Sequence, residues 1–293
     1  MRPLLRCRTY THAVNEALSA NRRRAALLLG GSGAAVGLAV WLVVATVIAV
    51  LTGPVAGMAI GVVLGVAAGC AAAWTARRDA TAVVVRAAGA TLATVVAEPG
   101  FHNVVEGLCV AAGLPKPALY VVDDEALNLC AAGLDHRGAA VLATSGLLRA
   151  LTRIELEGVV AHALTRIKTM QIVPETLAVT TVGLPVLLAE RGNGLAGAVA
   201  PTFARLLGRV VSANDELTDD MEGLMLTRYP PGLIAALEKM RAQGSALRRP
   251  SIAIDHLWLA PAVAAADGQL PHLAALVGAH DALADRLEAL REL

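Results

Sequence analysis

The sequence predicts a multi-pass α-helical membrane protein that also has a mostly helical α+β domain, and three observations support this fold class. Hydrophobic residues make up 56% of the 293 residues and charged residues only 17%, outside the usual balance of soluble domains. Residues 25–76 contain no Asp, Glu, Lys or Arg. After residue 77, helix-like segments alternate with strand-like ones, as in an α+β domain.

The uncharged run is long enough for two membrane helices, because one helix spans a bilayer with about 20 apolar residues. A turn signal, Thr52-Gly53-Pro54, interrupts the run near its middle. We therefore expect a transmembrane hairpin with helices near 25–51 and 55–75. A cleaved signal peptide is the other interpretation, but its apolar part would be only ~7–15 residues long.

Arginines flank both ends of the predicted hairpin. Six of them precede the first helix, at positions 2, 6, 8, 22, 23 and 24. Arg77 and Arg78 follow the second helix, and the connecting loop has no charge. The positive-inside rule then places both ends in the cytoplasm. Residues 1–24 are predicted to be a basic cytoplasmic tail, residues 25–76 the hairpin, and residues 77–293 a cytoplasmic domain.

A second apolar region, residues 172–211, interrupts this domain. Its first part, 172–189, contains one charge, Glu175, and two prolines, and its second part is short before Arg205 and Arg209. The region is therefore either a third and fourth membrane helix or a helical hairpin that lies against the membrane face.

The elements of the domain follow from periodicity and turn signals. We expect a helix at 103–112, strands at 118–122 and 139–143, and a short helix at 147–151. Thr152 stands three residues before Glu155, which is the spacing of a capping box. An apolar helical period follows it, so we predict a helix from 153 to about 168.

Charge and cysteine usage exclude several classes of function. The formal net charge is +1, so no basic surface for nucleic acid is expected. The four cysteines, at positions 7, 70, 109 and 130, form no C-x-x-C pair. Neither a disulfide framework nor a cysteine zinc site is indicated.

The predicted helix at 153–168 contains His162-Ala163-Leu164-Thr165-Arg166, which resembles an H-E-x-x-H motif with two letters changed. In that motif two histidines one turn apart bind zinc, and the glutamate is the general base for the metal-bound water. Here Ala163 replaces the base and Arg166 the second histidine. A lone histidine on a helix is usually an ordinary hydrogen-bonded side chain, so the flanking segments decide the interpretation.

Those flanks resemble the HtpX-like membrane-bound zinc metalloendopeptidases, a family of the gluzincin type. Similar segments precede, contain and follow the zinc helix: 103–108, 112–117, 120–124, 144–148, 155–159, 215–220, 227–239, 256–258 and 280–287. The resemblance covers nearly the whole chain. It implies a cytoplasmic, mostly helical metallopeptidase-like domain with a small sheet, in a protein of the bacterial cytoplasmic (inner) membrane.

The resemblance also implies roles for individual residues. His162 and Glu216 stand where the first and third zinc ligands would be, and Asp220 where a carboxylate orients a ligating histidine. Gln171 stands where the family has an aspartate. Arg166 cannot donate a lone pair to a metal, so we expect it either to form an ion pair with Glu216 or to extend, solvated, into the cleft.

The predicted function is that of a catalytically inactive homologue, a binding, scaffold or regulatory membrane protein that holds no metal cofactor. We expect the lipid bilayer and a protein or peptide of unknown identity as its partners. The family lays its substrate along an edge strand, for which six residues are the candidates: Ala139, Ala140, Val141, Leu142, Ala143 and Thr144.

The alternative function is an active zinc endopeptidase of membrane protein quality control with a non-standard ligand set. Asp219, Asp220 or His136 would then complete the zinc site.

Overall fold

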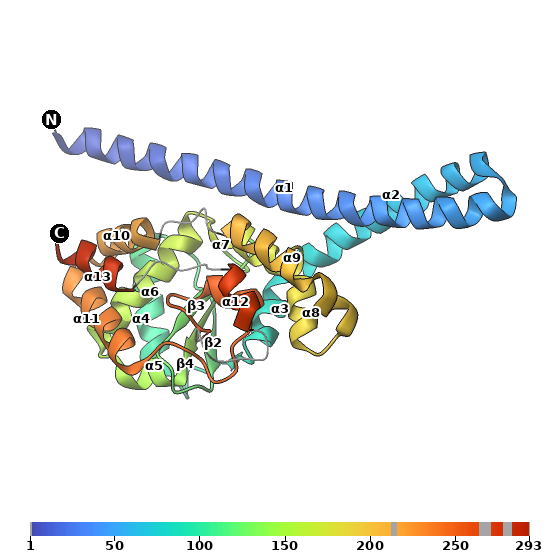
Figure 1. The fold of residues 1–293 in the computed structure, drawn as a ribbon. Coiled ribbons are helices and arrows are strands. Elements are labelled where there is room, and N and C mark those ends of the chain that lie inside the picture. The colour runs from blue at the N-terminus through green and yellow to red at the C-terminus, as the bar shows by residue number, and fades with distance from the viewer. Residues whose placement is uncertain (1, 212–215, 264–270, 278–282, 293) are drawn as a thin grey trace.

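The computed structural model describes residues 2–211, 216–263, 271–277 and 283–292. Within these ranges, the side chains of residues 2–15, 52, 216–218 and 271 are not described. The molecule consists of a long helical hairpin and a domain beside one end of it (Figure 1).

The hairpin is formed by α1 (Arg2–Thr52) and α2 (Pro54–Arg78). Gly53 between them has a φ of 102°, a conformation that favours glycine. The first helix is continuous, so residues 2–24, which we predicted to be a basic cytoplasmic tail, form the first part of α1. Its sequence explains this, because alanine, leucine and arginine are strong helix formers and no glycine or proline occurs between residues 4 and 29.

The two helices pack closely through small residues. A Cβ atom on Gly37 would lie 2.8 Å from the carbonyl oxygen of Gly65, and one on Gly69 only 2.5 Å from that of Gly33. Larger side chains would force the backbones apart. Within the described residues, two helices are long and apolar enough to cross a membrane, namely Glu16–Leu51 and Pro54–Arg78.

The second apolar region folds into α7 (Ile172–Thr180), α8 (Leu184–Glu190) and α9 (Gly194–Val211). All nine residues of α7 are buried in the protein. Its axis differs from that of α8 by 56°, and by length and composition this bent pair would make at most one further span. Whether the region crosses the membrane stays a prediction.

The domain contains a four-stranded sheet of β1 (Thr91–Leu92), β2 (Ala118–Val122), β3 (Leu129–Ala132) and β4 (Ala140–Thr144). The strand order is β1-β2-β4-β3. β4 pairs in parallel with β2 and antiparallel with β3, so both of its edges are occupied. The prediction that residues 139–144 form an edge strand for a substrate or partner is therefore wrong, because a backbone paired on both sides has no free groups for another strand.

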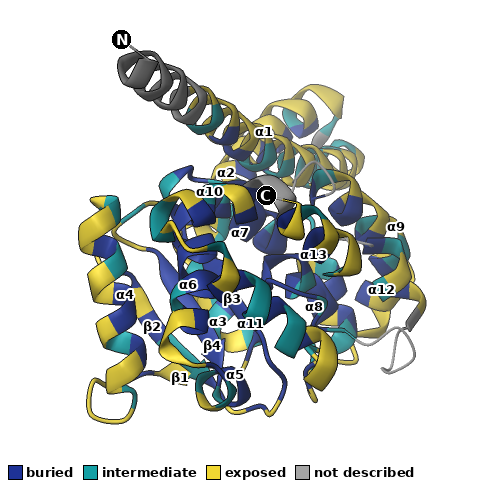
Figure 2. Ribbon diagram, turned by 90° about the vertical axis from the view of Figure 1, so that its left-hand side faces the viewer, coloured by how far each residue is buried: buried dark blue, intermediate teal, exposed yellow. Residues whose placement is uncertain are grey.

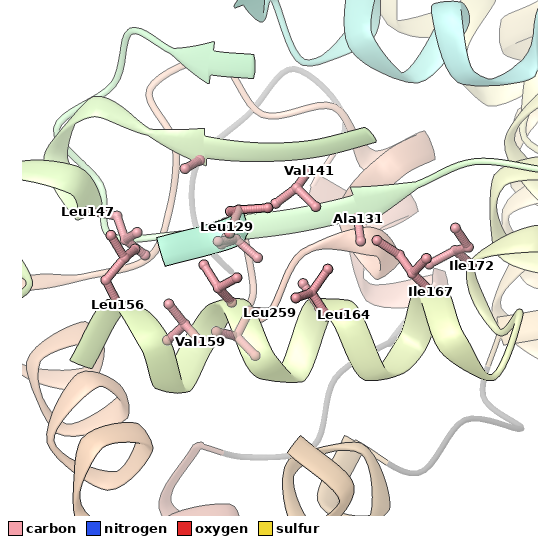
Figure 3. Packing of buried hydrophobic residues seen from close by; sticks show 14 of the residues in the cluster. Leu129, Ala131, Val141, Leu147, Leu156, Val159, Leu164, Ile167, Ile172 and Leu259 are labelled. Atoms are coloured by element: carbon pink, nitrogen blue, oxygen red, sulfur yellow. The ribbon is translucent and has the colours of Figure 1, made fainter. Parts of the chain in front are cut away.

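The central helix α6 (Arg153–Lys168) packs against this sheet and has the bounds that its capping box predicted. Twelve of its residues are buried. Figure 3 shows leucine, valine and isoleucine side chains filling the space between α6 and the strands. Figure 2 shows the contrast between this buried centre and the exposed hairpin.

The other elements surround this core, and the predicted helices at 103–112 and 147–151 are among them. They are α3 (Ala80–Ala87), α4 (Pro99–Ala112), α5 (Ser145–Ala150), α10 (Glu216–Thr227), α11 (Pro230–Gln243), a 3-10 helix (Ile252–Leu257), α12 (Pro271–Val277) and α13 (Leu283–Arg291). Their arrangement is visible in Figure 1.

The capping box of α6 supplies a pH-dependent contribution to stability. The carboxylate of Glu155 accepts hydrogen bonds from the backbone N–H of Thr152 at 2.7 Å and from Nζ of Lys239 at 2.7 Å. Burial raises the pKa of Glu155, but the hydrogen bonds from Lys239 and Thr152 together outweigh it, so the pKa lies below its usual value of 4.5.

Glu155→Gln keeps the capping geometry and removes the charge, so it should lower the free energy of unfolding by roughly 1–2 kcal/mol at pH 7. Because the folded-state pKa is depressed, the native carboxylate contributes this stability above pH 4.5 and loses it as the pH falls through the lower folded-state value. Thermal unfolding of both proteins between about pH 3.5 and 7 measures the difference. A constant difference over that range would contradict the prediction.

Candidate functional site

The candidate site lies where α6 meets α10. The two helices approach closely because Gly223 has no side chain: a Cβ atom there would lie 3.0 Å from the backbone nitrogen of His162. His162 itself is 2% exposed. The closeness of the backbones brings the polar residues of α10 directly onto the face of α6 that carries the degenerate motif.

His162 contacts a buried carboxylate on α10. Its Nδ1 atom lies 2.8 Å from Oδ1 of Asp220, an electrostatic contact without the alignment of a hydrogen bond. Asp220 also accepts two hydrogen bonds from Arg286 on α13, from Nε at 2.8 Å and from Nη2 at 2.9 Å. This bidentate pair is fully enclosed, with Asp220 0% and Arg286 1% exposed.

The environment of Asp220 favours its charged form. Burial raises the pKa of this carboxyl, but the contacts with His162 and Arg286 together outweigh the effect, so the pKa lies below its usual range. Asp220 is therefore an ionised side chain that holds three helices together. The structure places it beside His162, where the resemblance implies an orienting carboxylate.

Arg166, one turn after His162, is also buried and has partners from three segments. Its Nη2 atom donates to Oε2 of Glu175 on α7, and its Nη1 atom donates to the carbonyl oxygen of Leu257 at 3.2 Å. Its Nε atom lies 3.7 Å from Oδ2 of Asp219 on α10. The side chain is 6% exposed, so the expectation that it extends solvated into a cleft is wrong.

Asp219 completes this cluster. Its Oδ2 atom accepts a hydrogen bond from Nε2 of Gln171 at 2.9 Å. Burial raises the pKa of Asp219 above its usual range, although the charges of Arg166 and His162 act in the opposite direction. Gln171, at the position where the resemblance implies an aspartate, thus supplies an amide donor in place of another negative charge.

Two of the predicted roles fall on a side chain that is not described. Glu216 is the first residue of α10, but its side chain lies outside the described residues. Its role as third ligand and its ion pair with Arg166 therefore stay predictions. The acidic partner that the structure does show, Glu175, was missed as a site residue; the signal was its position as the one charge in residues 172–189.

The described residues do not fit a zinc ion. Among them, no three His, Cys, Asp or Glu side chains come together in a way that could hold a metal. The carboxylates beside Arg166 are hydrogen-bonded to its guanidinium or to Gln171, and the alternative ligand Asp220 is bound to Arg286. His136, the other alternative, has its Nε2 atom 3.3 Å from the carbonyl oxygen of Lys168 at the end of α6.

The outer edge of β3 is covered by the chain itself. Cys130 forms a β-bridge with Trp258, and the backbone N–H of Leu259 donates to the carbonyl oxygen of Leu129 at 2.8 Å. The side chain of Asn128 fixes the same segment, since its Nδ2 atom donates to the carbonyl oxygen of Ala260 at 2.7 Å. An added peptide would have to displace these bonds to pair with β3.

Comparisons with known proteins give a consistent result. A family model described as "Peptidase family M48" matches residues 97–293. Three similar proteins, each named "Protease HtpX homolog", come from Dictyoglomus thermophilum, Streptococcus uberis and Tropheryma whipplei. The first is 33% identical over 74% of this chain and 76% of its own length, and the second is 32% identical over 68% and 75%. The third is 38% identical over 55% of this chain and 62% of its own length, which is less than two thirds. No solved structure matches the chain.

Proposed function

Because the chain belongs to peptidase family M48, we propose that it is a catalytically inactive member of that family, a membrane protein that acts as a binding, scaffold or regulatory protein. The observation that supports this most strongly is Arg166, a buried guanidinium hydrogen-bonded to Glu175 on the helix that would bind zinc. A permanently protonated side chain at this position cannot be a ligand.

Electrostatics strengthens this argument. A dication about 4 Å from a guanidinium would be repelled by roughly 8 kcal/mol at an effective dielectric constant of 20. Moving the guanidinium away would break its hydrogen bonds to Glu175 and to Leu257 and leave a buried carboxylate unpaired. The cluster around Arg166 therefore opposes the binding of zinc.

The second loss concerns the reaction itself. Ala163 has no proton acceptor, and a general base typically contributes about 10²–10⁴-fold to a rate. Without the metal there is also no activated water to attack a peptide bond. Both losses affect the same nucleophile, so a single compensating residue would not restore hydrolysis.

We place the protein in the bacterial cytoplasmic membrane, with the hairpin as a transmembrane anchor and the domain in the cytoplasm. Two contacts support the position of the domain at the basic end of the hairpin. Nδ2 of Asn21 donates to the carbonyl oxygen of Thr169 at 3.0 Å, and Oγ1 of Thr180 donates to that of Ala76 at 3.0 Å. These contacts join the domain to the ends of the helices that arginines flank.

Metal content and hydrolysis test the proposal together. We expect full-length protein, purified in detergent without chelator, to contain far less than one zinc per chain and to leave an unfolded protein substrate intact. Native protein and His162→Ala should give the same result. One zinc per chain, with cleavage that chelator and His162→Ala both abolish, would overturn the proposal in favour of an active endopeptidase with a non-standard ligand set.

A further inference from the structure

A cavity of about 280 Å³ lies between α1, α7 and α9, and neither His162 nor Asp220 is among the residues that line it. Its lining includes two arginines from different helices, Arg24 of α1 and Arg209 of α9, next to Leu27, Leu28 and Val210. The cavity is close in size to the smaller ligand pockets, which begin at about 300 Å³. It combines a cationic part with an apolar part.

Both arginines are available to a ligand. Each is exposed, and neither forms an ion pair within the part of the chain that the structure describes. Among the described residues neither guanidinium has a carboxylate partner, and two such groups lining one cavity suit an anion with several acceptor oxygens.

The place of the cavity in the chain indicates where such an anion comes from. Arg24 is the last charged residue before the uncharged run, and Leu27 and Leu28 follow within one helical turn. In a membrane-embedded hairpin this is the level at which headgroups meet acyl chains. Leu27 and Leu28 then lie on the hydrocarbon side of Arg24 along α1, and Val210 adds an apolar side chain to the same cavity.

One acidic residue, Glu175, also lines the cavity. It is 3% exposed, and its Oε2 atom accepts a hydrogen bond from Arg166. Its negative charge is therefore offset inside the protein, and the two exposed arginines dominate the charge that a ligand meets.

We propose that this cavity binds an anionic phospholipid of the surrounding membrane, with the phosphate held by Arg24 and Arg209 and the start of an acyl chain against Leu27, Leu28 and Val210. The site requires that the hairpin is embedded in a bilayer, and it is independent of the proposed loss of catalysis. It would fix the angle between the hairpin and the domain, because its two cations belong to different elements.

Native mass spectrometry of the full-length protein in detergent tests the proposal. We expect phosphatidylglycerol to bind more tightly than phosphatidylcholine with the same acyl chains, and inorganic phosphate alone not to compete. Arg24→Gln with Arg209→Gln should weaken phosphatidylglycerol binding on the order of tenfold or more. Arg23→Gln with Arg205→Gln removes the same charge from the same two helices outside the cavity, so we expect less than a twofold change.

Three results would overturn the site. Equal losses in the two double variants would indicate general surface attraction, and equal binding of both lipids would indicate apolar contact alone. Full competition by inorganic phosphate would indicate a site for free phosphate.

Leu27→Trp is a second variant, which narrows the cavity and keeps both charges. It should also weaken phosphatidylglycerol binding, and tryptophan is tolerated at this membrane level. Unchanged binding there would contradict the proposal even if the arginine variant failed to fold.

Discussion

Arg166→Ala should lower the free energy of unfolding by about 3–5 kcal/mol, because it leaves buried carboxylates without their cation. Glu175 is 3% and Asp219 5% exposed, so neither carboxylate is well solvated. In a protein of this size the melting temperature should fall by about 10 °C, which thermal unfolding of the detergent-purified protein measures. The loss should shrink as the pH falls, since protonation removes the unpaired charges.

The matched control removes the pair as a whole. Arg166→Met combined with Glu175→Leu replaces two buried charges by apolar side chains, a change that is often neutral or stabilising. Asp219 keeps its hydrogen bond from Gln171. We therefore expect the double variant to melt near the native temperature. If the double variant were as unstable as Arg166→Ala, the lost stability would belong to packing and not to the charge pair.

Restoring the motif should produce the second large effect, a gain of zinc binding. The variant combines Ala163→Glu and Arg166→His with Glu175→Leu, because a histidine at 166 would leave the Glu175 carboxylate without the guanidinium that now binds it. His162 keeps its contact with Asp220 at 2.8 Å, which is the kind of interaction that orients a ligating imidazole. By resemblance, Glu216 would supply the third ligand.

We expect this triple variant to bind one zinc per chain. At a zinc concentration 1,000 times the dissociation constant, the folded state should gain about 4 kcal/mol, which a thermal shift and metal analysis both detect. Ala163→Glu alone is the control, and it should bind no zinc because Arg166 remains. Adding His162→Ala to the triple variant should abolish the gain. A folded triple variant that binds no zinc would show that the scaffold, and not only the chemistry, has changed.

The parts of the fold that the sequence predicted well are those with strong local signals. α6 has the predicted bounds because its capping box fixes the start, and both hydrogen bonds of that box are formed. β2 has the predicted bounds as well. The hairpin was predicted from the uncharged run at residues 25–76, which is long enough for two membrane-spanning helices. In each case the whole signal lies in one continuous stretch of the sequence.

The parts that were missed depend on contacts between distant residues. β3 is only four residues long and buried on both faces, so its side chains show no alternation of apolar and polar residues. The central position of β4 follows from that missed strand, which explains the wrong prediction of an edge. The pairing of Arg166 with Glu175 depends on how α7 folds back over α6, and the spacing of nine residues gives no hint of it.

The covered edge of β3 has a consequence for how the molecule behaves among its neighbours. An edge strand with unpaired backbone N–H and C=O groups can pair with a strand of another molecule. Proteins usually prevent this with charged side chains, proline or a β-bulge at the edge. Here the chain's own backbone occupies the edge, through the β-bridge between Cys130 and Trp258 and the hydrogen bond from Leu259 to Leu129. The segment that occupies this edge in place of a peptide therefore also closes the edge to a strand of a neighbouring molecule.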